Sequence, residues 1–135
     1  MFEHVGKPFY KTYFKKINEL LSDEGIALVH TIGNIRTPKL TPTFIRKYIF
    51  PGGYIPSLSE IMPAIERSGL IISDIEVLRL HYAKTLSHWF QNFKNSKDEV
   101  LKLYDERFIR MWEAYLNLSE LSFLKGDNVI FQLVL

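Results

Sequence analysis

Five side chains in this sequence suit acid–base chemistry, and each is expected where a β-strand ends. They are Glu3, His4, His30, His81 and Tyr82. In open α/β sheets, ligands bind beyond the C-terminal ends of the strands, so residues at these ends share one rim. A carboxylate, imidazoles and a phenol supply both donors and acceptors for a small polar ligand. We therefore expect a polar site at this rim, with a purely structural role for each single His as the alternative.

Other kinds of site find little support in the residue types. Cysteine is absent, which excludes disulfides, thiolate metal sites and a Cys nucleophile. No candidate nucleophile lies near His30 in the sequence, so no hydrolytic triad is evident. Glu3 and His30 have the chemistry of metal ligands, but no HExxH spacing supports a metal site. Gly52 and Gly53 lack the preceding strand that a phosphate- or dinucleotide-binding loop requires.

The elements that must position these residues follow from hydrophobic spacing. Apolar residues at helical spacing, a capping box from Ser57 to Glu60 and a stop at Gly69 predict helices. The helices are expected over 7–21, 43–48, 57–68, 83–93 and 106–124. Apolar runs predict strands over 25–32, 70–80 and 128–135. This order of elements is typical of an α/β protein, here with few strands for its helices.

Two of the three strands are so apolar that burial on both faces is expected, as in a parallel sheet with helices on each side. No strand is predicted before the first helix. A sheet of three strands also has two exposed edge strands, and this fits poorly with strands that are buried on both faces. We therefore expect the chain to be part of a larger sheet. Either an N-terminal half is missing, or a second copy completes the sheet in a homo-oligomer.

Composition places the chain among ordinary globular proteins. Its 135 residues are 47% apolar and 24% charged, and no run of about 18 apolar residues could cross a bilayer. No secretory signal precedes the first helix, which fits a cytoplasmic chain. The net charge of +2 is too small to indicate nucleic-acid binding. Lys and Arg clusters near 7–16 and at 46–47 are either solvated faces or contacts to an anionic lipid surface.

Six short segments, in this order and at this spacing, resemble the family of cyclopropane-fatty-acyl-phospholipid synthases and mycolic acid cyclopropane synthases. They cover nearly all of the chain, and the ordered set is highly specific although no single segment is decisive. The segments are MFEHVG at 1–6, HTIG at 30–33, YIFPGG at 48–53, PSLSE at 56–60, LHY at 80–82 with Thr85, Leu86 and Trp89, and RMWE at 110–113 with Tyr115 and Leu116.

The resemblance implies a class I S-adenosylmethionine-dependent methyltransferase fold, whose seven-stranded sheet ends in an antiparallel strand between its neighbours. The three strands here would be the last three of that sheet. All of 1–135 would belong to one domain, with a helical insertion beside the lipid site at about 82–125. The implied activity is methyl transfer to a cis double bond of a phospholipid acyl chain, which forms a cyclopropane.

In this family a bound bicarbonate is the base that removes a proton from the new methyl group. The matching ligands in this sequence are Glu3, His30 and Tyr82, which are implied to be catalytic, and the backbone amide of Ile32. Three further residues match positions along the family's acyl tunnel, namely Phe50, Leu86 and Phe123. Apolar residues at helical spacing also build cores, which is the alternative role for these three. The implied partner is the acyl chain of a phospholipid at the inner face of an anionic membrane.

The sequence departs from the family in its missing N-terminal half. That half holds the glycine-rich cofactor loop, an acidic ribose-binding residue and a Cys near the bicarbonate. S-Adenosylmethionine is thus the implied cofactor, but we expect its site to be largely absent from this chain and the chain to be inactive alone. Two alternatives remain: a non-catalytic module that binds lipid or self-associates, and a methyltransferase with another lipid or small-molecule acceptor.

Overall fold

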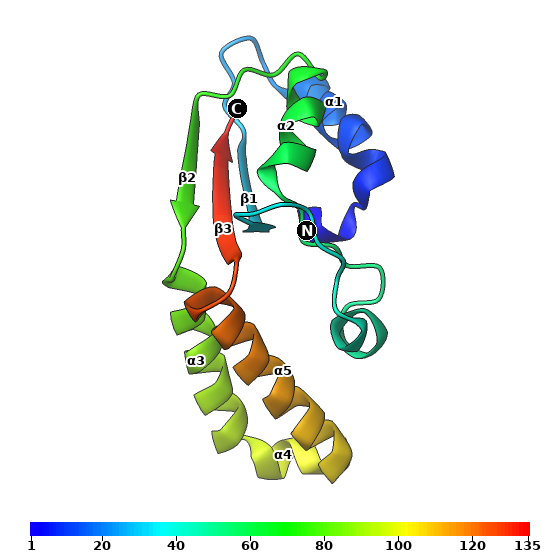
Figure 1. Cartoon of the computed structure of the whole chain (residues 1–135), viewed down its shortest axis with the longest axis vertical. Helices are drawn as coiled ribbons and strands as arrows, with labels where there is room; N and C mark the ends of the chain where they lie inside the picture. The colour runs from blue at the N-terminus through cyan, green and yellow to red at the C-terminus, as the bar shows by residue number, and fades with distance from the viewer. The chain divides into compact units, whose positions relative to one another are not determined.

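The computed structural model describes residues 1–135, which form two compact units (Figure 1). The first unit comprises Met1–Leu78 and Asn128–Leu135, and the second comprises Arg79–Asp127. No helix in either unit combines the length and the apolar character needed to cross a membrane.

A three-stranded sheet forms the centre of the first unit. The strand β3 (Asn128–Val134) lies between β1 (Leu28–Asn34) and β2 (Asp74–Leu78). It runs antiparallel to both neighbours, so β1 and β2 point in the same direction. The antiparallel strand between its neighbours, which the resemblance implied, is confirmed.

Helices cover one face of this sheet (Figure 1). α1 (Tyr10–Leu20) and α2 (Leu58–Glu66) pack there because their apolar stripes meet alternate residues of the strands. The largest buried contributors to this core are Phe2, Phe14, Ile61, Ile65, Phe131 and Leu133. Full burial of each such side chain contributes about 1.5–3 kcal/mol of hydrophobic stabilisation.

The expectation of two-sided burial is wrong for β1, and β2 is also largely exposed. Along β1, buried and exposed residues alternate at first, and Leu28 is 60% exposed. Because α1 and α2 cover only one face, the side chains that point to the other face stay in contact with solvent. Both strands also differ from their expected bounds: β1 extends two residues further, to Asn34, and β2 is confined to five residues. Only the central strand, β3, is mostly buried.

Short helical turns precede α1 and interrupt the connection between β1 and α2. These are the 3-10 turns η1 (Phe2–His4) and η2 (Lys7–Phe9), and the π-helical turn η3 (Ile45–Ile49). The turn η3 lies where the sequence predicted a short helix. Gly69 has a φ of +87°, as expected for the residue that stops the helix preceding it.

The second unit is built from three helices, α3 (His81–Asn95), α4 (Lys97–Leu101) and α5 (Glu106–Leu124). α5 has the predicted bounds, whereas α3 is two residues longer than expected at each end. Asp105 caps α5, since its carboxylate accepts a hydrogen bond from the Phe108 amide at 2.8 Å. A ladder of stacked rings runs through Tyr104, Phe108 and Trp112, with centroid distances of 4.1 and 5.7 Å.

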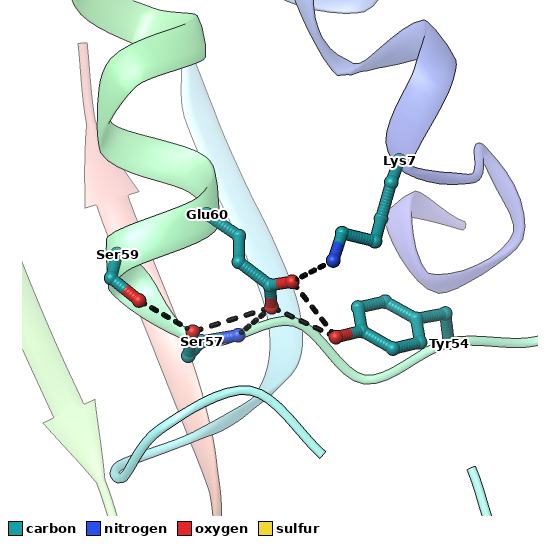
Figure 2. Close-up of polar contacts among 5 residues, drawn as sticks. All are labelled: Lys7, Tyr54, Ser57, Ser59 and Glu60. Carbon is teal, nitrogen blue, oxygen red and sulfur yellow. Dashed lines mark hydrogen bonds and ion pairs between the residues drawn. The ribbon is translucent and has the colours of Figure 1, made fainter. Parts of the chain in front are cut away.

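Glu60, in the first turn of α2, joins three segments of the first unit (Figure 2). Its carboxylate accepts hydrogen bonds from the Ser57 amide at 2.9 Å and the Tyr54 hydroxyl at 2.8 Å, and it pairs with Lys7. The predicted capping box is thereby confirmed. Burial would raise the pKa of Glu60, but Lys7, the Ser57 amide and the Tyr54 hydroxyl outweigh it and hold the pKa below its usual range. The backbone of Tyr54 then donates to the Glu3 carbonyl at 2.9 Å, which ties this network to the site.

Candidate functional site

The carboxylate of Glu3 lies at the outer edge of β1. Its Oε1 atom accepts hydrogen bonds from the Ile32 amide at 2.6 Å and from the Thr31 hydroxyl at 2.9 Å. The other oxygen, Oε2, lies 3.0 Å from the amino group of Met1. The Ile32 amide points away from β3, so Glu3 takes the place of a neighbouring strand as its acceptor. The structure therefore brings together two of the predicted bicarbonate ligands.

This environment keeps Glu3 ionised. Burial raises its pKa, but hydrogen bonds from the amides of Glu3 and Ile32, the Met1 amine and the Thr31 hydroxyl outweigh the burial, so the pKa lies below its ordinary value. An ionised carboxylate is an acceptor only. Glu3 is therefore suited to orient a donor, such as the hydroxyl of a bound anion, rather than to supply a proton.

His30 lies within β1 rather than at its end, which corrects the sequence expectation. The pairing of β1 with β3 continues to Asn34, four residues further on, and thereby moves the strand end away from His30. The Nδ1 atom of His30 lies 3.1 Å from the amide nitrogen of Gln132. With the amide nitrogen as the donor, Nδ1 accepts, and this pairing corresponds to the ring tautomer that carries its proton on Nε2. This leaves Nε2–H as the donor that a ligand would meet.

The two halves of this site lie on different sides of the β1 backbone. His30 shares a sheet face with Gln132 and Glu76, which lie opposite one another across the strands. Thr31 points to the face covered by α1 and α2, where it is buried. The expected common rim at the strand ends is therefore wrong for His30: the polar groups gather around the middle of β1 instead.

The other predicted residues for acid–base and lipid contact lie mostly in the second unit. The ring of Tyr82, in the first turn of α3, lies 5.1 Å from the Phe123 ring and 5.9 Å from the Trp89 ring. Leu86, one helical turn after Tyr82, is buried, as is Phe123. Tyr82, Leu86 and Phe123 thus belong to one apolar region of this unit. Their roles toward bicarbonate and an acyl chain stay predictions.

Phe50, the third predicted lipid residue, belongs to the first unit. It follows η3 and is 39% exposed. Its ring meets the imidazole of His4 edge-on, with centroids 5.7 Å apart. His4, a candidate for acid–base chemistry, thus contacts Phe50, a candidate for contact with the acyl chain. Contact between Phe50 and an acyl chain stays a prediction.

Sequence reasoning missed two polar partners of the site, Thr31 and Gln132. Thr31 donates to Glu3, and the side-chain amide of Gln132 lies within hydrogen-bond distance of Nδ1 of His30. A signal for Gln132 was present in the sequence, because it is the one polar residue in the apolar run 129–135. A polar side chain within a buried strand is expected to have a hydrogen-bond partner.

The residues of this chain do not form a cradle for S-adenosylmethionine. Such a cradle needs a strand, a glycine-rich turn and the N-terminus of a helix in succession. Here β1 is followed by the long connection 35–57, and β2 leads into α3 with no glycine between them. We therefore derive no reaction step from a cofactor bound to these residues alone.

The strand order and the comparison with solved structures define the C-terminal part of a class I S-adenosylmethionine-dependent methyltransferase fold. Residues 1–133 match the family described as mycolic acid cyclopropane synthetase, and the chain belongs to this family. The resemblance found in the sequence is thereby confirmed.

Individual relatives agree with this assignment. The chain is 38% identical over 134 residues to the cyclopropane-fatty-acyl-phospholipid synthase of Escherichia coli (strain K12). The matched region covers 99% of this chain and 35% of that protein. It is 37% identical over 138 residues to the tuberculostearic acid methyltransferase UfaA1 of Mycobacterium tuberculosis, covering 98% of this chain and 32% of that protein. The crystal structure of mycolic acid cyclopropane synthase CmaA1 with SAH and CTAB is similar with a TM-score of 0.89 and 28% identity, over 98% of this chain and 51% of that one. The chain thus spans about a third of the length of these curated relatives.

Proposed function

We propose that this chain is the C-terminal part of an S-adenosylmethionine-dependent methyltransferase that converts a cis double bond of a phospholipid acyl chain into a cyclopropane. Membership of the family supports methyl transfer to lipids. The observation that carries the proposal for the site is the Glu3 carboxylate, held at the Ile32 amide at 2.6 Å. His30 lies two residues before Ile32 on the same strand.

In the proposed site a bicarbonate ion binds between these groups. The Ile32 amide and the Nε2–H of His30 donate to its oxygens, and Glu3 accepts from its hydroxyl. The resemblance to the family implies the Tyr82 hydroxyl as a further donor. Because Glu3 already accepts from the Ile32 amide, bicarbonate must share or displace this hydrogen bond. An ionised Glu3 also repels an anion, so its contact has to run through the bicarbonate hydroxyl.

A bound bicarbonate would supply the base for a proton of the methyl group newly attached to the acyl chain, and its charge would offset positive charge on that chain. S-Adenosylmethionine would supply the methyl group from residues outside this chain. The apolar side chains of Leu86 and Phe123 would exclude water that would trap a carbocation.

Turnover of a joined enzyme tests these roles. The chain would be fused to the preceding part of the Escherichia coli relative, which is expected to carry the cofactor site. We expect Glu3→Gln, His30→Ala and Tyr82→Phe each to lower turnover far more than affinity for S-adenosylmethionine. The exposed Glu24→Gln and Tyr104→Phe serve as matched controls with unchanged turnover. Normal turnover in all three site variants would reject the assigned roles.

A second candidate function is methyl transfer that ends in a methyl branch instead of a ring. The relative named tuberculostearic acid methyltransferase, at 37% identity, favours this outcome almost as well as the synthase at 38%. Proton NMR of the extracted lipid distinguishes the products, since ring protons resonate upfield of chain methylenes. A branched product would reject ring closure and keep lipid methylation.

A further inference from the structure

Residues 35–53, which the proposed reaction uses only through Phe50, form a loop that we call the basic loop. Its surroundings in the sequence are unusually free of acids. The segment 25–59 contains four of the 17 Lys and Arg residues and none of the 15 Asp and Glu residues, so it carries +4 while the rest of the chain carries −2. All four cations lie in the basic loop: Arg36, Lys39, Arg46 and Lys47.

The basic loop projects from the sheet and is closed at its base. The Asn34 amide donates to the Pro56 carbonyl at 2.8 Å, and the Thr41 hydroxyl donates to the Gly53 carbonyl at 2.8 Å. Between these bonds the chain makes the π-helical turn η3. Figure 1 shows this part of the first unit as a teal loop that stands away from the sheet, α1 and α2. The loop is therefore a defined surface feature.

Large apolar side chains of the basic loop face solvent beside its cations. Leu40 is 88% exposed, Tyr48 is 47% exposed and Ile35 is 43% exposed. The Lys47 ammonium lies 5.0 Å from the centroid of the Tyr48 ring. Each square ångström of apolar surface removed from water is worth about 25 cal/mol, so these side chains favour an apolar partner. Aromatic, aliphatic and cationic groups in one exposed segment are the composition of an interfacial membrane anchor.

We propose that the basic loop docks the protein onto an anionic phospholipid surface. Leu40 and Tyr48 enter the headgroup region, while Arg46 and Lys47 contact lipid phosphates. The inference deepens the proposed function, on which it rests for the identity of the substrate, because an acyl chain must be taken from a bilayer. Exposed aliphatic side chains have no counterpart on a nucleic acid, which favours lipid as the partner.

The lysines of the first helical region are a weaker candidate for this contact. Lys7 pairs with Glu60, and Lys15 and Lys16 both lie within 4 Å of Glu19. Their charge is thus partly offset by neighbouring carboxylates, whereas 25–59 has no carboxylate of its own. Substitution of Lys15 and Lys16 therefore serves as the matched control for substitution of Arg46 and Lys47.

Vesicle sedimentation with the 135-residue chain tests the inference. The vesicles contain saturated phosphatidylglycerol and phosphatidylcholine, or phosphatidylcholine alone, and no S-adenosylmethionine is added. We expect binding to the anionic vesicles that weakens with salt. Arg46→Gln with Lys47→Gln should lower the partition coefficient roughly 30-fold, since each Lys or Arg near the surface contributes about fivefold. Leu40→Ser should weaken binding without changing its salt dependence.

The control variant makes the same charge change elsewhere, with Lys15→Gln and Lys16→Gln, and should bind almost as the unaltered chain does. Melting curves check that every variant is folded, and Arg46→Lys should retain binding. The inference would be overturned if the control variant lost as much binding as the loop variants, or if the loop variants lost none. Equal binding to neutral vesicles, or the same pattern of binding to a single-stranded oligonucleotide, would also overturn it. Saturated lipids have no double bond, so docking is measured apart from methyl transfer. Normal docking without turnover in the joined enzyme would reject the proposed function alone.

Discussion

Glu3 accepts a hydrogen bond from the Ile32 amide at 2.6 Å, which joins the first turn of the chain to the edge of β1. This bond satisfies a backbone donor that no strand pairs with, and it fixes the carboxylate beside the strand that carries His30. Burial raises the pKa of Glu3, but the Glu3 amide, this bond and the other hydrogen bonds to the carboxylate outweigh it and hold the pKa below its ordinary value. The stability of the fold and the position of the ionised Glu3 carboxylate therefore both depend on this hydrogen bond, and each can be tested.

Glu3→Gln should remove part of the acid sensitivity of folding. The pKa of Glu3 is lowered in the folded protein, so its stabilisation is present above the unfolded value of about 4.3 and is lost as pH falls through the lower folded value. At neutral pH the variant should lose about 1.5–3 kcal/mol, the usual contribution of a hydrogen bond to a charged group. Urea unfolding from pH 7 to pH 3 measures both effects.

The exposed Glu24→Gln is the control for that measurement. Glu19 and Glu60 also have lowered pKa values, but they contribute equally to both proteins and cancel in the comparison. If Glu3→Gln and the unaltered chain lose stability in parallel as the pH falls, the ionised state assigned to Glu3 is wrong.

Gln132→Leu should remove the preference of the neutral His30 ring for one tautomer. In the unaltered chain the Gln132 amide donates to Nδ1 at 3.1 Å, so the neutral ring should carry its proton on Nε2. Nitrogen-15 spectra that correlate ring nitrogens with ring protons read the tautomer directly. We expect mainly the Nε2–H form in the unaltered chain and a mixture in the variant. A mainly Nδ1–H form in the unaltered chain would contradict the assignment.

Gly33→Ala should destabilise the first unit because a Cβ at this position would overlap the ring of Phe131. Phe131 is buried in β3 and cannot move without disturbing the core. Overpacking of this kind costs about 1–3 kcal/mol. Urea unfolding of Gly33→Ala, Phe131→Leu and the double variant measures the coupling. Additive losses would show that the ring and position 33 do not meet.

S-Adenosylmethionine should leave the melting temperature of the 135-residue chain unchanged. A ligand at about 100 times its dissociation constant stabilises a protein by about 2.7 kcal/mol, which a melting curve detects easily. The residues of this chain form no glycine-rich turn between a strand and a helix, so we expect no such gain. A concentration-dependent increase would mean that this chain holds the cofactor after all. The fused enzyme supplies the positive control.

The sequence predicted the elements well where local signals are strong. α5 has the predicted bounds because its apolar stripe marks it, and the Ser57–Glu60 box marks the start of α2. The strands were placed less well. An apolar run such as 26–29 does not reveal whether helices cover one face or two, and this depends on residues distant in the chain.

The candidate site shows the same limit. Residue types and family resemblance indicated Glu3, His30 and Ile32, but the position of His30 depends on how far β1 pairs with β3. Pairing is a long-range property, so the expected strand end was misplaced. Thr31 and Gln132 were missed because their roles come from contacts across 28 and 102 residues of sequence.

The dependence of turnover on bicarbonate tests the central claim most directly. The fused enzyme would be assayed on unsaturated phospholipid vesicles in buffer depleted of carbon dioxide, with and without added bicarbonate, and with Glu3→Gln in parallel. We predict that bicarbonate restores cyclopropane formation in the unaltered enzyme and fails to restore it in Glu3→Gln. Turnover that is the same with and without bicarbonate would contradict the account.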